Sequence, residues 1–191
     1  MSIKNGLALP SFSWKNLGGF TLIELLVVFS IIIIFSALIL LNFQAGEQQF
    51  SLERSSHRLA QDIRRAEEMA MSLKEFQGRI PSGGYGIYFS KYVRAEEINY
   101  DIYLYADTNG NEKYNRGEEI ETLSLEREVK IKEVRADGVS ADQTSINFKP
   151  PDPVIAISPG GNLTIITLSL KADSAKTKNV IVNKAGLIYV E

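Results

Sequence analysis

A long apolar run near the N-terminus constrains this chain more than any other feature. Residues 20–43 read FTLIELLVVFSIIIIFSALILLNF, and Glu24 is the only ionisable side chain among these 24 positions. A helix of about 20 apolar residues is long enough to cross the ~30 Å hydrocarbon core of a bilayer. The run is therefore predicted to be a membrane helix. The 191 residues leave room for one globular domain besides it, but hardly for two independent cores.

The residues that precede the run carry only positive charge. Segment 1–19 holds two lysines and no acid, whereas acids return after the run. Basic flanks stay in the cytoplasm, so we expect the N-terminus inside and the rest of the chain outside. A secretory signal would have small residues after its apolar region. Here the small residues Gly18 and Gly19 come before it, so a cut at this point would leave the whole helix on the mature protein.

The junction GFTLIELLVV at 19–28 resembles the leader junction of type IV pilins and type II secretion pseudopilins. In that family a membrane-bound prepilin peptidase cuts after the glycine and methylates the new N-terminus. The resemblance therefore implies that 1–19 is a leader peptide, that cleavage falls between Gly19 and Phe20, and that Phe20 becomes N-methylated. The junction combines a glycine, an aromatic residue, one acid at fixed spacing and an apolar run, which makes it specific.

Glu24 is the fifth residue after the expected cut, where the family has its glutamate. The resemblance implies that it pairs with the N-terminal amine of a neighbouring subunit and sets the register as helices stack. Independently, a carboxylate inside a membrane helix costs roughly 3 kcal/mol on insertion scales, so a partner or a function is expected for it. The alternative is an incidental acid close enough to the interface for its side chain to reach water.

Beyond Gly46 apolar residues recur at helical spacing. Those on the expected apolar stripe are Leu52, Leu59, Ile63, Ala66, Ala70 and Leu73. This period predicts an amphipathic helix over 44–76, whose stripe holds the globular part. No proline lies between Phe20 and Ile80, so the membrane segment 20–43 and the amphipathic segment can form one helix.

Residues 77–191 are predicted to form a β-rich head. The expected strands, rich in β-branched and aromatic residues, are 85–89, 100–105, 120–125, 129–134, 145–149, 154–157, 163–170, 179–183 and 187–190. We expect an antiparallel sheet with a hairpin at 184–186 and a C-terminal strand tied into the sheet. The predicted fold class is α+β: a long N-terminal helix packed on a C-terminal antiparallel β-sheet head, the pilin fold. The order of elements, the turn NFKPPDP at 147–153 and the closing segment 182–190 resemble the H-type minor pseudopilins.

The loop DTNGNEKYNRGE at 107–118 has oxygen-bearing side chains at calcium-loop spacing. The ligands would be Asp107, Asn109, Asn111, the backbone carbonyl of Lys113, Asn115 and Glu118, at positions 1, 3, 5, 7, 9 and 12. However, Glu112 stands where the sharp turn normally has glycine. A solvated hairpin tip explains the same residues through their turn propensities. Both interpretations stay open; calcium would stiffen the head, and no cofactor is required.

The chain is predicted not to be an enzyme. It has no cysteine, which excludes thiol catalysis and cysteine-ligated zinc. His57 is the only histidine and has no nucleophile motif beside it, so a surface or packing role is expected.

The sequence favours a type IV pilin-like structural subunit: a single-pass cytoplasmic (inner) membrane protein that assembles by helix packing into an extracytoplasmic filament, as in pilus biogenesis. Expected partners are prepilin peptidase, other pilin or pseudopilin subunits, an inner-membrane assembly platform and, before assembly, membrane lipid. A net charge of −2 gives no reason to expect nucleic acid as a partner.

Three alternatives remain. One is a minor pseudopilin of a type II protein secretion system. Another is a signal-anchored binding or enzymatic domain. The third is a DNA-binding minor pilin, for which the available cations are Lys171, Lys176, Lys178 and Lys184.

Overall fold

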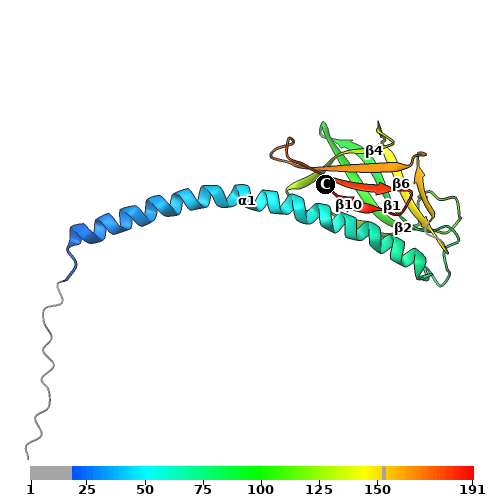
Figure 1. Cartoon of the computed structure of the whole chain (residues 1–191), viewed down its shortest axis with the longest axis horizontal. Coiled ribbons are helices and arrows are strands. Elements are labelled where there is room, and N and C mark those ends of the chain that lie inside the picture. The colour runs from blue at the N-terminus through cyan, green and yellow to red at the C-terminus, as the bar shows by residue number, and fades with distance from the viewer. Residues whose placement is uncertain (1–18, 152–153) are drawn as a thin grey trace, which may run out of the picture. The chain divides into compact units, whose positions relative to one another are not determined.

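The computed structural model describes residues 19–151 and 154–191, without the side chains of 40–45 and 154. The predicted leader up to residue 18, and residues 152–153 of the predicted proline turn, lie outside these ranges. The chain divides into two compact units, Met1–Phe43 and Gln44–Glu191. In the described residues one helix is followed by ten strands (Figure 1).

The helix α1 extends from Leu22 to Met71. It ends in a hydrogen-bonded cap in which Lys74 N donates to Met69 O and Leu73 N to Ala70 O, both at 3.1 Å. Leu73 takes the left-handed conformation that this cap requires, with φ 50°, where helices usually have glycine. The helix thus ends five residues before the predicted limit at 76.

The apolar stripe of α1 is buried as predicted except at its last position. Leu52, Leu59, Ile63, Ala66 and Ala70 are buried, whereas Leu73 is 47% exposed. The prediction for Leu73 is wrong because the helix has already ended there, so helical spacing no longer directs its side chain to the core.

The strands form two antiparallel sheets rather than the one that we expected. Their bounds are β1 Gly84–Arg94, β2 Glu97–Asp107, β3 Glu119–Leu123, β4 Val129–Ala136, β5 Val139–Ser140, β6 Gln143–Lys149, β7 Val154–Ser158, β8 Leu163–Leu170, β9 Thr177–Asn183 and β10 Ile188–Val190. One sheet has the order β3-β2-β1-β6-β7 and the other β10-β9-β8-β4-β5. Each of the nine predicted segments corresponds to a strand, although β3 ends at Leu123 and β10 begins at Ile188, inside the predicted ranges; the two-residue β5 was not predicted. The predicted α+β fold is confirmed.

The C-terminal strand is tied into the second sheet. β10 pairs with β9 from Ile188↔Val182 to Val190↔Val180, which confirms the predicted hairpin. Asn179 and Glu191 exchange two backbone hydrogen bonds of 2.9 Å, so the last residue of the chain is held in place.

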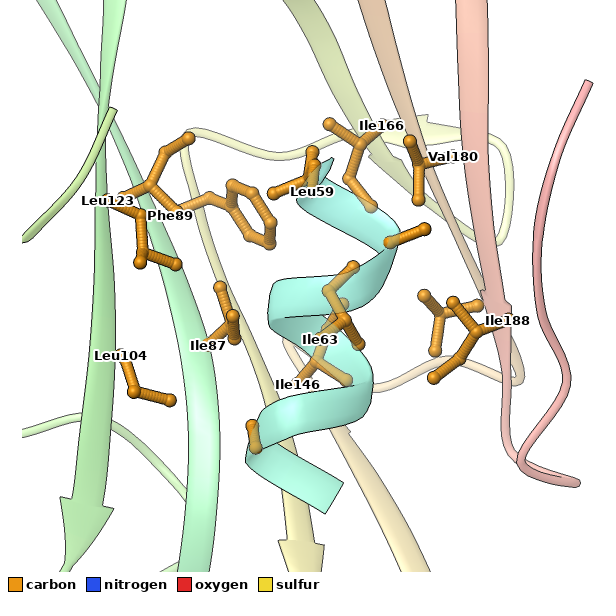
Figure 2. Close-up of a cluster of buried hydrophobic side chains, with 14 of the residues drawn as sticks. Leu59, Ile63, Ile87, Phe89, Leu104, Leu123, Ile146, Ile166, Val180 and Ile188 are labelled. Atoms are coloured by element: carbon orange, nitrogen blue, oxygen red, sulfur yellow. The ribbon is translucent and has the colours of Figure 1, made fainter. Parts of the chain in front are cut away.

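The C-terminal part of α1 lies between the inner faces of the two sheets. In Figure 2, Leu59 and Ile63 of the helix have Phe89 and Leu104 of the first sheet on one side and side chains of the second sheet on the other. The second-sheet residues are Ile166, Val180 and Ile188. Each fully buried side chain of this kind stabilises the fold by about 1.5–3 kcal/mol. The amphipathic half of α1 is therefore part of the core of the head.

Candidate processing and assembly site

The start of α1 is capped by Thr21. Its hydroxyl oxygen accepts a hydrogen bond of 3.2 Å from the backbone amide of Glu24. Thr21 and Glu24 have the Thr-x-x-Glu spacing of a capping box, in which the cap residue satisfies one of the free amides of the first turn. Thr21 was not among the predicted site residues, although its spacing from Glu24 alone indicates this capping role. The cap fixes where the helix begins, two residues after the predicted cleavage point.

The predicted cleavage point is accessible. Gly19 precedes the helix, and a Cβ built on it meets no atom within 4 Å. Phe20 is 79% exposed. Gly19 and Phe20 are thus exposed and outside any helix or strand, directly ahead of the cap, where an enzyme can reach the peptide bond that joins them.

The first part of α1 exposes apolar side chains all round. Every residue from 22 to 39 is exposed. Within the described residues, Leu22–Ile39 is the one helical segment long and apolar enough to cross a membrane. Ser30 adds little polarity, because its hydroxyl donates to Leu26 O at 2.8 Å. A helix apolar on every face is stable in lipid or packed among other chains, not alone in water.

Glu24 lies in the first turn of this apolar segment, and its side chain is exposed. The ion pairs among the described residues all lie within Gln44–Glu191 and do not include Glu24. An acid near the start of a helix is favoured by the helix dipole, by about 0.3–1 kcal/mol at an exposed position. That gain is smaller than the cost of a carboxylate in hydrocarbon. A cationic partner would offset the rest of this cost when Glu24 leaves water.

Comparison with known protein families places a signature on this same segment. Residues 14–40 match the family described as the prokaryotic N-terminal methylation motif, the signature of pilins and pseudopilins. No curated protein and no solved structure matches the chain. The motif supports a type IV pilin-like or pseudopilin-like protein, and it implies processing by a prepilin peptidase and assembly with other pilin-like subunits. The resemblance of the head to the H-type subfamily remains a prediction.

The second candidate site, the loop at 107–118, folds back onto the outer face of the first sheet. The ring of Tyr114 stacks on Tyr88 of β1 at 4.2 Å between centroids, and Tyr114 N donates to Ser145 Oγ of β6 at 3.3 Å. Lys149 of β6 forms an ion pair of 3.1 Å with Glu112. The loop is thus fastened to strands that lie far from it in sequence, which a freely solvated hairpin tip would not be.

A glycine makes room beneath this loop. A Cβ on Gly86 would lie 2.7 Å from the ring of Tyr105 and 2.5 Å from Ile146 O. Tyr105 is fully buried there, and burial raises the pKa of its hydroxyl. The hydroxyl of Tyr114 donates to Glu119, and this bond lowers the pKa of the Glu119 carboxyl. The outer face of the sheet therefore holds an ordered layer of tyrosines.

Both carboxylates of the predicted calcium site point into the loop and are buried. Asp107 accepts from the amides of Gly110 and Glu112, both at 2.7 Å. Glu118 accepts from Thr108 N at 3.0 Å and Asn115 N at 2.8 Å. Backbone amides thus satisfy both acids within the loop itself.

The loop fits a calcium ion in backbone and ligand order but not in the direction of two amides. Glu112 adopts φ 61°, so it makes the turn that normally uses glycine. Asn109 and Asn111 both direct their Nδ2 toward Asn115 Oδ1, at 2.9 and 2.8 Å. An ion would need the oxygens of these amides turned inward, a rotation that exchanges amide O and N. Calcium remains a prediction on these terms.

The remaining sequence candidates do not gather into a site. His57 is exposed on α1. Lys171, Lys176 and Lys178 lie at the start of β9 or in the connection before it, whereas Lys184 follows the other end of that strand. The four lysines therefore do not form one basic surface.

Proposed function

We propose that this protein is a non-enzymatic structural subunit that prepilin peptidase cleaves after Gly19 and that then assembles, by packing of its apolar helix, into an extracytoplasmic filament of the pilus type. The observation that supports this most is one arrangement: an uncovered Gly19–Phe20 junction directly before a helix that exposes apolar side chains on every face and holds Glu24 in its first turn.

This arrangement suits a helix that moves from the lipid of the bilayer into contact with the apolar helices of other subunits. In the bilayer the exposed side chains of 22–39 contact lipid, and the basic leader holds the N-terminus in the cytoplasm. After cleavage, Phe20 carries a new positively charged amine. Glu24 of one subunit pairs with this amine on a neighbour, so that the cost of burying each charge is offset only in the correct register. The inner-membrane platform would supply the work of extraction.

A second candidate function is a minor pseudopilin of a type II secretion system. The same motif and the same helix chemistry serve both roles, and the head has the order of elements that favoured the H-type resemblance. Secretion of exoproteins by a strain that lacks this chain separates the two: loss of secretion with intact surface pili supports the pseudopilin.

The test of the main proposal is Gly19→Ala, with Gly46→Ala as the matched control. A Cβ meets nothing within 4 Å at either glycine, so neither substitution disturbs the chain itself. We expect Gly19→Ala to accumulate as an unprocessed membrane precursor without filaments. We expect Gly46→Ala to be processed normally, since alanine is favoured by about 1 kcal/mol inside a helix. Filaments of normally processed Gly19→Ala protein would overturn the proposal.

A further inference from the structure

A cleft of about 300 Å³ lies in the head between β2, the connection from β3 to β4 and the start of β4. Tyr100 and Ile102 line it from β2, Leu125 from the connection, and Val129 and Ile131 from β4. This volume is at the lower limit of ligand pockets, so the cleft suits a narrow ligand.

One wall of the cleft is an open strand edge. β2 begins at Glu97, but its pairing with β3 starts only at Ile102↔Leu123. Residues 97–101 therefore extend past β3. In the described part of the chain, β1 is the only strand that pairs with them. Open edges of this kind are where a further strand can add.

The register shows which backbone groups face the open edge of β2. The β1–β2 hairpin closes at Arg94↔Glu97 around a two-residue turn with φ 51° and 67°, so these two residues exchange hydrogen bonds. Alternate residues of an antiparallel strand turn their N–H and C=O groups to opposite neighbours. Ile98 and Tyr100 therefore turn theirs away from β1, toward the open side.

The charges around the cleft favour an acidic ligand. Arg127, Lys130 and Lys171 line it, and none of the three takes part in the ion pairs of the described residues. Of the two acids that line it, Glu126 is already bound to Arg54 at 2.9 Å, which leaves Asp101. Apolar surface adjoins the edge, because Ile98 is 43% exposed.

We propose that this cleft binds an extended acidic segment of another protein, which adds as a strand to β2 at 97–101. Main-chain hydrogen bonds to Ile98 and Tyr100 provide affinity, and alternate side chains provide specificity. Apolar residues of the added strand cover Ile98, while its acids face the cations. This binding is independent of leader cleavage and of filament assembly.

The experiment uses the full chain in detergent micelles and two probes: a hexapeptide of alternating glutamate and valine, and its counterpart with lysine in place of glutamate. Amide hydrogen exchange is followed by mass spectrometry resolved to residues 97–101. We expect the glutamate peptide to slow exchange there and the lysine peptide to leave it unchanged. No slowing, or equal slowing by both peptides, would overturn the proposal.

Two proline variants separate edge binding from damage to the hairpin. Ile98→Pro removes an N–H that faces the open edge of β2, next to the cleft. Val93→Pro is the control. Val93 is the partner of Ile98 in the β1–β2 register, but its N–H points to the opposite edge of the hairpin. At that edge Val93 lies beyond the last β1–β6 pair, Ser90↔Gln143. Proline is tolerated at edge positions of both kinds.

The glutamate peptide should bind Ile98→Pro about fivefold more weakly, the loss expected for one hydrogen bond, and Val93→Pro with unchanged affinity. Equal affinity for both variants would overturn the proposal. The proposal would also be overturned if exchange at 97–101 slowed with increasing protein concentration in the absence of any peptide. A second copy of the chain would then occupy the edge.

Discussion

Thr21 caps the helix turn that contains Glu24: the Thr21 hydroxyl oxygen accepts a hydrogen bond from the Glu24 amide at 3.2 Å. Glu24 thus has two separable properties. Its backbone amide fixes the start of α1, and its carboxylate is the only charge in the apolar segment that follows.

Glu24→Gln separates these properties, because glutamine also suits the third helical position of a capping box but carries no charge. We expect the helix to begin where it does now, while assembly falls by about a hundredfold or more, since an unpaired amine would be left buried in the filament. Sedimentation of filaments from equal amounts of cleaved subunit measures this.

Thr21→Ala is the control, since it removes the cap, worth about 1 kcal/mol, and keeps the charge. Its assembly should fall far less than that of Glu24→Gln. If Glu24→Gln assembled as well as the wild type, the proposed pairing of Glu24 would be wrong.

Gly86→Ala is expected to destabilise the head by about 2 kcal/mol, because the added Cβ collides with the Tyr105 ring and with backbone of β6. For a unit of this size the melting temperature should fall by about 5 °C. Near-ultraviolet circular dichroism of the tyrosines reports the transition. Gly160→Ala, where a Cβ meets nothing within 4 Å, should melt like the wild type; equal melting of all three proteins would contradict the packing described for the loop.

The ion pair between Arg54 and Glu126 should make stability depend on pH. Arg54 donates Nε to Oε1 at 2.9 Å and Nη2 to Oε2 at 3.0 Å, and this bonding lowers the pKa of the Glu126 carboxyl below its usual 4.5. A lowered folded-state pKa contributes stability above the unfolded-state value, which is lost as the pH falls through the folded-state value. The contribution is present at pH 7 and is lost as the pH falls below 4.5 and through the lowered pKa of the Glu126 carboxyl.

Both partners are partly exposed, and water screens their attraction, so the pair contributes little to the stability of the fold. Arg54→Gln should therefore unfold slightly more easily than the wild type at pH 7 and equally at pH 3, as measured by denaturant titration. A difference that is the same at both pH values would show that the pair itself does not stabilise the head.

Calcium binding to the loop at 107–118 is expected to be weak, with a Kd of about 10⁻⁴–10⁻³ M, because only Asp107 and Glu118 among the predicted ligands are charged. Titration calorimetry on the full chain should give heat, and calcium should raise the melting temperature. Glu118→Gln should abolish both effects. If titration gave no heat and a chelator did not change the melting temperature, the loop would not bind calcium.

The sequence predicted the elements of this protein better than their arrangement. The apolar run and the stripe from Leu52 to Ala70 have helical periods, and the strands have the expected composition, so helix and strands were found. The division into two sheets was not, because it depends on which strands pair across long stretches of chain, as β1 does with β6. The amino-acid composition of a strand does not specify which other strand it pairs with.

The site followed the same pattern. Gly19, Phe20 and Glu24 could be predicted as site residues because the junction is local in sequence, and the family match over 14–40 covers that junction. The fastening of the loop was not predictable, because Tyr114 depends on Tyr88 and Ser145, which come from two other strands. The open edge of β2 was equally hidden, since it arises from the difference in length between two paired strands.

Mass spectrometry of the N-terminus of the mature protein tests the central claim most directly. We expect a chain that begins at Phe20 and carries one methyl group on its amine. A mature protein that begins at Met1, or that is cut anywhere other than after Gly19, would contradict it.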